Sequence, residues 1–188
     1  MNDVTRLTGS DVLNVLDELA HLRIQVFREF PYLYDGDLTY ERDYLQTYAN
    51  SPNAVVVIAR HQGRVIGAST GLPLIEAEAE FQAPFDDPEK WFYFGESVLL
   101  PEFRGQGLGH AFFDHREAHA NEYRHLCFCA VDRPDSHPLR PQNYRNLHAF
   151  WHKRGYQQQA QLTATFKWQD LDQAAETNHS LTFWTRTR

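Results

Sequence analysis

The feature that most constrains this chain is a turn with three alternating glycines, which lies between an apolar segment and a segment of helical character. Trp91 to Leu100 is strongly apolar and predicts a strand, and Leu108 to Tyr123 predicts a helix. The first N–H groups of a helix lack backbone partners, and the helix dipole favours an anion there. Glycines let a ligand approach the backbone and permit positive φ angles. A strand, a glycine turn and a helix in this order indicate a phosphate site.

Two common phosphate-binding sequences do not fit this turn. A Walker loop ends in Gly-Lys-Ser/Thr, whereas this chain has Gly107-Leu-Gly-His110. A dinucleotide fingerprint needs the spacing G-x-G-x-x-G, whereas the glycines here follow G-x-G-x-G. The glycines alone leave two interpretations open: a phosphate site, or a tight entry into the helix that binds no ligand.

The residues around the turn decide between these two interpretations. The string Leu99-x-Pro101-Glu-Phe-Arg104-Gly-x-Gly-x-Gly109 resembles the signature of the GNAT superfamily of acyl-CoA-dependent N-acetyltransferases. Downstream, Phe150-Trp-His-Lys153-Arg-Gly155-Tyr156 resembles the Phe-Tyr-x-Lys-x-Gly-Phe segment at the end of that family's last helix. The resemblance extends over residues 5–187 and has its specific motifs in 96–110 and 150–156.

The resemblance implies acetyl-CoA as the acyl donor and assigns it a set of residues. In the family, backbone groups of the strand before the turn pair with the pantetheine arm, and a backbone N–H near the position of Leu99 stabilises the oxyanion. Backbone amides of the turn hold the pyrophosphate, to which Arg104 could add charge. The cofactor residues implied here are Ser97, Val98, Leu99, Arg104, Gly105, Gln106, Gly107, Leu108, Gly109 and His110.

Glu96 is the candidate general base that must generate a neutral amine. It stands in an otherwise apolar strand, where burial would raise its pKa toward neutrality. The resemblance points to the same residue, because some family members carry a catalytic glutamate at this position. The alternative is an ion-paired or solvent-facing strand residue.

Trp151 stands where the family commonly has a tyrosine that protonates the leaving thiolate. An indole N–H donates a hydrogen bond but is not an acid at neutral pH. Tyr144, His148, His152 and Tyr156 are near in sequence, and none of them is assigned. The missing tyrosine supports a rival function, a non-catalytic CoA-binding sensor or interaction module. A third candidate is transfer of a longer acyl group on the same fold.

Histidine and cysteine pairs could in principle bind a metal. His115 and His119, like His148 and His152, are four residues apart on predicted helices, but no third ligand is evident. We therefore expect solvent-facing helices and no metal. Cys127 and Cys129 are expected to be small buried side chains with free thiols in a reducing compartment.

Two charged segments give opposite indications about the acceptor. Residues 76–89 contain six acidic residues and no basic one, which favours a cationic amine. The loop 133–145 contains three arginines, which favours an acidic acceptor. The acceptor, an amine on a small molecule or a peptide, is left open.

Composition limits the remaining classes of function. The chain has 188 residues, 42% of them hydrophobic, and a net charge of 18 − 25 = −7. This length and hydrophobic content predict one ordered domain over 1–188 rather than disorder, and the resemblance implies that it is an N-acetyltransferase domain. The acidic balance argues against nucleic acid. Since no apolar run is long enough for a bilayer and no signal peptide is visible, a cytoplasmic protein without membrane contact is expected. An edge or C-terminal strand could pair two copies into a homodimer.

The order of predicted elements gives the fold class. Helices are expected over 12–30, 37–48, 108–123 and 142–154, and strands over 54–60, 65–72, 91–100, 125–132, 156–168 and 180–187. Strands alternate with helices only in the middle of the chain. This order predicts an α/β (α+β) fold with a single mixed, mostly antiparallel sheet flanked by helices, which is also the fold that the resemblance implies.

Overall fold

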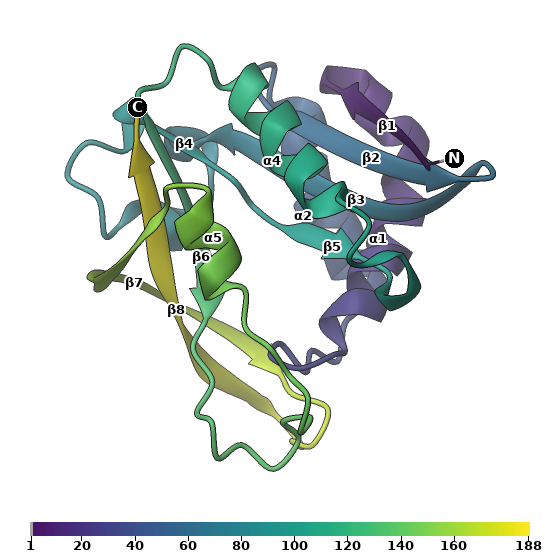
Figure 1. Cartoon of the computed structure of the whole chain (residues 1–188), viewed down its shortest axis with the longest axis vertical. Coiled ribbons are helices and arrows are strands. Elements are labelled where there is room, and N and C mark those ends of the chain that lie inside the picture. The colour runs from purple at the N-terminus through teal and green to yellow at the C-terminus, as the bar shows by residue number, and fades with distance from the viewer. Residues whose placement is uncertain (1) are drawn as a thin grey trace.

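A mixed sheet runs through the molecule and divides at its centre (Figure 1), as described by a computed structural model for residues 2–188. The strands are β1 (Asn2–Leu7), β2 (Val55–His61), β3 (Arg64–Pro73), β4 (Trp91–Tyr93), β5 (Ser97–Leu99), β6 (His125–Val131), β7 (Gln157–Gln169) and β8 (Glu176–Thr187). The α-helices are α1 (Leu16–Phe27), α2 (Leu38–Asn50), α3 (Ala79–Gln82), α4 (Leu108–His119) and α5 (His148–Lys153).

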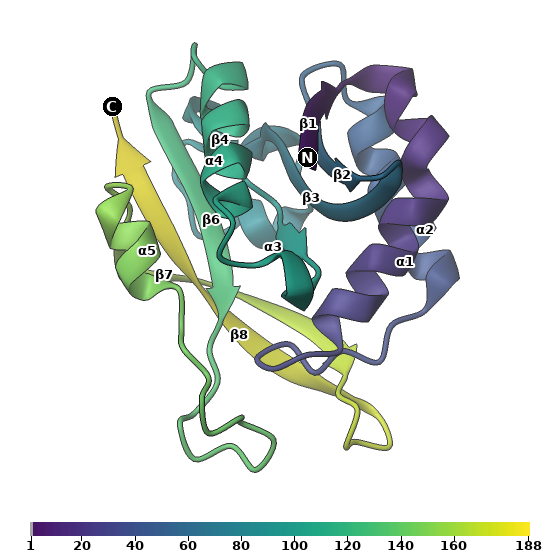
Figure 2. The same cartoon turned by 45° about the vertical axis from the view of Figure 1, so that its right-hand side comes forward.

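The strand order is β1-β2-β3-β4-β6-β8-β7, with β5 paired to β3 beside this path. Among the strands of residues 2–188, β4 and β6 are the one parallel pair, and the other pairs are antiparallel. Figure 2 shows α1 and α2 on one side of the sheet and α4 and α5 on the other. The predicted fold class, a mixed and mostly antiparallel sheet flanked by helices, is confirmed.

The division of the sheet corrects one prediction, because the expected strand 91–100 is two strands. β3 pairs with β5 along its middle and with β4 at its end. Leu72 pairs with Tyr93 and Ser69 with Ser97, so the chain has one extra residue opposite β3 in the segment around Gly95, whose N–H donates to Thr70 O at 3.1 Å. A Cβ on Gly95 would collide with the hydroxyls of Tyr48 and Thr70, so only glycine fits this close approach.

Two further differences concern the start of the chain and the loop before α5. The polar segment Asn2–Leu7 forms β1 at the sheet edge, although its sequence carries no clear strand pattern. The helix expected over 142–154 is only α5, because Tyr144 packs edge-on against Phe30 with ring centroids 4.7 Å apart and keeps the preceding loop irregular. Gly155 follows the end of α5 as expected.

The acidic stretch 76–89 is anchored rather than loose. Phe81 packs 4.3 Å from Phe166 of β7, and Phe85 packs edge-on against Phe183 of β8, measured between ring centroids. The short helix α3 therefore covers the same side of the sheet as α2.

Cys127 and Cys129 are buried free thiols, as expected, and burial raises the pKa of Cys129 to about 12. Within residues 2–188, no helix combines the length and the apolar character that a membrane span requires.

Candidate active site

The strands β5 and β6 diverge below the branch of the sheet, which leaves one edge of β5 unpaired within residues 2–188. Leu100 N–H donates to Ile66 O at 2.9 Å, and Glu96 O accepts from Thr70 N–H at 3.1 Å. Because backbone groups alternate in direction along a strand, the N–H groups of Ser97 and Leu99 face away from β3. These donors point toward the gap between β5 and β6.

The glycine turn lies at the end of the same strand. Gly105 and Gly107 have φ angles of +76° and +84°, and Gly107 is the N-cap residue of α4. No side chain caps the helix, so its first N–H groups stay available for a ligand. A Cβ at either glycine would meet open space. The turn thus has the positive φ angles, the free amides and the room that an anion site needs.

Arg104 shapes the turn with its side chain. Its Nε and Nη2 donate to Leu99 O at 3.1 and 3.0 Å, and its Nη1 lies 2.9 Å from Glu29 Oε2. The guanidinium therefore ties the end of β5 to the segment after α1. A charge contribution of Arg104 to the cofactor is expected from the sequence, but this side chain is already occupied by two partners.

Glu96 lies at the branch, and its side chain is only 6% exposed. Its Oε1 is 2.6 Å from Nη1 of Arg23, and its Oε2 accepts from the hydroxyl of Tyr44 at 3.2 Å. Arg23 also pairs with Glu41 of α2, so two carboxylates share one buried guanidinium. The expected burial of Glu96 is confirmed. Of the two alternatives to a free base, an ion-paired residue and a solvent-facing residue, the structure shows the ion pair. The guanidinium of Arg23 gives the buried carboxylate of Glu96 a counter-charge.

The cluster around Glu96 continues into α2. The hydroxyls of Tyr44 and Tyr48 lie 2.8 Å apart, and burial raises the pKa of both tyrosines. Both phenols therefore stay protonated at neutral pH and act as hydrogen-bond donors.

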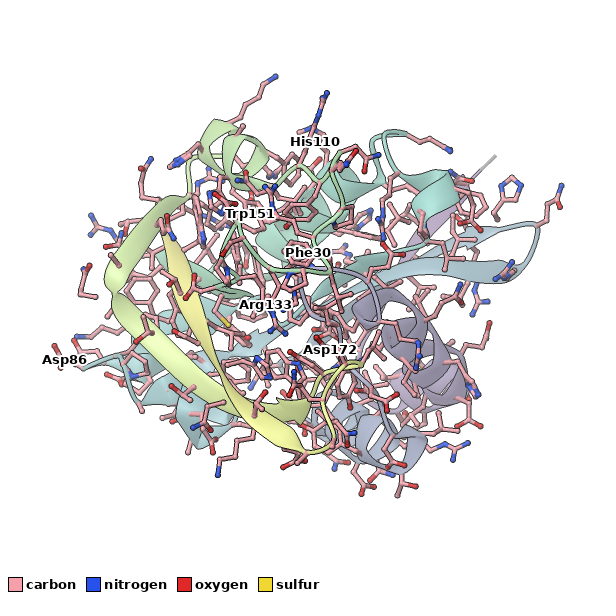
Figure 3. The ribbon with its side chains drawn as sticks, turned by 90° about the horizontal axis from the view of Figure 1, so that it is seen from below. Phe30, Asp86, His110, Arg133, Trp151 and Asp172 are labelled. Atoms are coloured by element: carbon pink, nitrogen blue, oxygen red, sulfur yellow. The ribbon has the colours of Figure 1, made fainter. Side chains whose placement is uncertain are left out.

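Trp151 packs against the sheet on the α5 side. Its ring lies 5.0 Å from that of Phe128 and 4.9 Å from that of Trp184, between centroids. A cavity of about 570 Å³ opens nearby, between the end of α1, the end of β6 and the loop 132–147, and His148 is one of its lining residues. Seen from below (Figure 3), Phe30 and Arg133 lie centrally, between Trp151 and His110 on one side and Asp172 on the other.

The arginines of the loop 133–145 are mostly engaged within the protein. Arg133 forms a double hydrogen bond with Asp170, at 2.8 and 2.7 Å, and also donates to the carbonyls of Pro31 and Tyr32. Arg140 lies 3.2 Å from Asp135. The segment after α1 is thereby fixed to β6 and to the end of β7.

The histidine pairs show no metal site. His119 Nε2 lies 2.9 Å from Asn53 O, and His148 and His152 pack against the ring of Trp184. Within residues 2–188, no group of three or more His, Cys, Asp or Glu side chains could hold a metal ion.

Sequence reasoning missed two buried arginines, Arg23 and Arg116, that hold the branch from opposite sides of the sheet. The spacing of residues in the sequence contains a signal for each of these arginines. Arg23 follows Leu19 by four positions and Arg116 follows Phe112 by four, which places both on the apolar faces of their helices. A charged residue on such a face has to find partners inside the protein.

The match that decides the family covers residues 19–156, which correspond to the model of the Acetyltransferase (GNAT) family. The chain belongs to the GNAT family. It is an acyltransferase, and the resemblance stated from the two sequence motifs is confirmed. Family membership therefore argues against the non-catalytic alternative. The general activity of this family is acetyl transfer from acetyl-CoA to an amine.

Solved structures agree with this assignment at the level of the fold. The ribosomal-protein-alanine N-acetyltransferase of Brucella melitensis has 15% identity, with 99% of each chain covered and a TM-score of 0.62. The GNAT-family acetyltransferase of Streptococcus pneumoniae has 12% identity, full coverage of both chains and a TM-score of 0.62. The Salmonella typhimurium protein yncA, whose structure contains its cofactor acetyl-CoA, has 10% identity over 98% of this chain and 94% of its own, with a TM-score of 0.62. No curated protein matches the chain in sequence.

Proposed function

We propose that this acyltransferase moves the acetyl group of acetyl-CoA directly to a primary amine, with both substrates bound together. The observation that carries the proposal is the free edge of β5, whose N–H groups at Ser97 and Leu99 lead to the unoccupied amides of the glycine turn. A strand edge suits the amide-containing pantetheine arm, and the helix N-terminus suits the pyrophosphate. Nothing in this arrangement requires a metal.

The cofactor residues in this proposal are those of the strand and the turn. Ser97, Val98 and Leu99 supply the strand, and the pyrophosphate lies against backbone amides between Arg104 and His110. Acetyl-CoA supplies the activated thioester. The chain orients the two substrates and supplies the N–H donors for the oxyanion, and both effects lower the barrier to acyl transfer.

Glu96 acts as the general base in this scheme. The amine arrives as an ammonium ion and must lose a proton before its lone pair attacks the thioester carbon. The carboxylate, paired with Arg23, accepts that proton directly or through a water molecule. The carbonyl electron pair moves to oxygen, then returns as the C–S bond breaks with its pair on sulfur. The nitrogen releases its remaining extra proton to water, and the departing thiolate takes up a proton from water to become the free CoA thiol.

The contacts of the charged side chains favour a cationic acceptor. Arg133 and Arg140 are paired with aspartates, which weakens the argument for an acidic acceptor. Glu78 lines a cavity of about 10 Å³, the size of a single water molecule, together with Tyr44 and Tyr48, on the side of the sheet where Glu96 lies. Burial and the neighbouring Glu80 raise the pKa of Glu78, so an ammonium group would be a favourable neighbour for its carboxylate.

Two further expectations concern the cellular location and the oligomeric state of the protein. Two free buried thiols and dependence on acetyl-CoA are consistent with a cytoplasmic enzyme. Within residues 2–188, β1 and β7 each pair on one side only, so a homodimer through either edge strand stays a prediction.

The test is a turnover screen with acetyl-CoA and a panel of polyamines, amino acids and peptides, in which release of the free CoA thiol is measured. The proposal expects turnover with at least one primary amine, and with cationic acceptors before anionic ones. Turnover with anionic acceptors alone would reject the cationic assignment. Acetyl-CoA binding without turnover on any amine would favour the non-catalytic alternative, and faster turnover of a longer acyl-CoA would favour the third candidate.

A further inference from the structure

Arg116 of α4 is an almost completely buried cation that lacks a carboxylate partner. Its side chain is 1% exposed, and none of the ion pairs within residues 2–188 includes it. Arg23 and Arg133, whose side chains are each 9% exposed, each face at least one carboxylate. An unpaired buried charge is destabilising unless something else compensates it, so its position calls for a functional explanation.

The guanidinium of Arg116 is held where the sheet divides. Its Nη1 donates to Thr70 O at 3.2 Å and to Glu96 O at 3.0 Å, which are the two carbonyls at the branch. Its Nη2 donates to Ser97 Oγ at 2.8 Å, and its Nε donates to Phe112 O at 3.3 Å.

Two aromatic rings complete this environment. The guanidinium carbon lies 4.5 Å from the ring centroid of Phe94 and 4.8 Å from that of Phe113. Every strong contact is therefore with a neutral oxygen or an aromatic face. Desolvation lowers the pKa of Arg116 to about 10, so the group keeps its charge at neutral pH.

The position of this charge relative to β5 suggests its role. Ser97 is the first residue of β5, and its own N–H is one of the two donors that face the gap beside β6. A negative charge that forms on the thioester oxygen would lie against these donors. Arg116 donates to the carbonyl oxygen of the peptide bond whose N–H belongs to Ser97, so its charge lies behind that donor. Glu96 and Glu117 interact with this charge, but neither forms an ion pair with it, and a low-dielectric interior transmits such a field well.

The geometry points to Arg116 as a positioning residue for acyl transfer, which fixes the start of β5 and makes its N–H edge a stronger site for the oxyanion. This inference rests on the proposed function. During the step the amine nitrogen bonds to the carbonyl carbon and the π pair moves to oxygen. The pair then returns to the carbonyl as the C–S bond breaks with its pair on sulfur, while the nitrogen loses a proton to water and the sulfur gains one from it. Arg116 keeps all its protons and touches neither substrate.

The direct test is the carbonyl stretch of 13C-labelled acetyl-CoA bound to the enzyme, measured by isotope-edited infrared spectroscopy together with kcat and KM. In the wild type, the stretch should move to lower wavenumber than in free acetyl-CoA. Arg116→Met should lose most of that displacement and lower kcat about tenfold or more, with KM for acetyl-CoA little changed, because the loss of a direct oxyanion donor lowers kcat about 10²–10³-fold.

Three further variants separate charge from shape. Arg116→Lys keeps the charge without the fork of donors and should retain more of the displacement than Arg116→Met. Ser97→Ala removes one partner at an exposed position and should lose part of it, which keeps the test decisive if Arg116→Met does not fold. Val57→Ala, in the core of β2, shows what destabilisation alone does and should leave the stretch unchanged.

The outcomes distinguish this inference from the proposed function. An unchanged stretch and an unchanged kcat in Arg116→Met would overturn the role of Arg116 while leaving acetyl transfer intact. Equal losses in the Lys and Met variants would make Arg116 a purely structural residue, which also overturns the inference. If wild-type protein does not bind acetyl-CoA at all, the proposed function and the inference both fail.

Discussion

At the scale of single residues, Gly107 and Gly63 have nearly the same backbone but different surroundings. Their φ angles are +84° and +82°, and a Cβ at either position would meet no atom within 4 Å. Gly107 begins α4 in the glycine turn, whereas Gly63 lies in the tight connection between β2 and β3. The pair therefore separates backbone strain from the loss of a phosphate site.

Gly107→Glu should abolish acetyl-CoA binding, because the new carboxylate fills the turn and repels the phosphates. Gly63→Glu adds the same charge and a similar strain of about 1–2 kcal/mol, but should leave binding intact. Isothermal titration with acetyl-CoA measures both variants. Normal binding by Gly107→Glu would show that the turn is not the phosphate site.

Glu96→Gln should lower kcat about 10²–10⁴-fold and leave the dissociation constant of acetyl-CoA nearly unchanged, because it removes the proton acceptor without touching the turn. Arg23 keeps its partner Glu41 in this variant, so the buried cation is not left alone. Glu18→Gln is the matched control, since Glu18 forms a surface ion pair with Arg60 at 3.4 Å. A kcat within twofold of wild type for Glu96→Gln would remove Glu96 from the mechanism.

At the residue scale, the sequence predicts the positions of the site residues but not their partners. The glycine turn, the apolar strand before it and the position of Glu96 could be predicted, because each depends on a local pattern. The partners of Glu96 could not, since Arg23 is 73 positions earlier in the chain. Arg104 shows the same limit, because a motif gives its position but not the direction of its side chain.

At the scale of elements, long-range packing overrode local patterns. The strand expected over 91–100 divides because β3 offers two different partners along its length. The helix expected over 142–154 shortens because the loop packs on Phe30. By contrast, α2, α4 and the two last strands form near their predicted positions, because their hydrophobic periodicity agrees with the faces that they bury.

A stability prediction concerns the Arg133–Asp170 pair, which joins the loop after β6 to the end of β7 and holds Arg133 where it donates to the carbonyls of Pro31 and Tyr32 after α1. These side chains are 9% and 5% exposed. Asp170→Asn should lower the free energy of unfolding by about 3–5 kcal/mol, because it leaves a buried guanidinium without its counter-charge. Asp17→Asn, which breaks the exposed pair with Arg42, should lower it by less than about 1 kcal/mol.

Urea unfolding of the two Asp→Asn variants measures both values. Equal effects would contradict the interpretation that Arg133 and Asp170 anchor the segment, since burial is the main difference between the two pairs.

At the scale of the whole molecule, buried tyrosines set the response to alkaline pH. Burial raises the pKa of Tyr32, Tyr48, Tyr93 and Tyr156 above the ordinary value. A group whose pKa is higher in the folded state stabilises the protein fully below its unfolded pKa, which is about 10 for tyrosine. That stability is lost as pH rises through and above this value.

The free energy of unfolding should therefore be nearly level from about pH 8 to 9 and fall steeply above about pH 10. The lowered pKa of Arg116 makes the free energy of unfolding rise with pH instead, but Arg116 is a single group and the buried tyrosines are several. Urea titrations at successive pH values, with phenolate absorbance as a second signal, measure the effect. A constant free energy up to about pH 11 would contradict it.

The most direct measurement of the central claim is thermal unfolding with and without acetyl-CoA. A ligand at about 100 times its dissociation constant adds about 2.7 kcal/mol, which for a chain of this size raises the midpoint by about 5–10 °C. The midpoint should rise by that amount with acetyl-CoA, by less with adenosine diphosphate and not at all with NAD. An unchanged midpoint in millimolar acetyl-CoA would contradict it, because the glycine turn and the free edge of β5 would then not be a cofactor site.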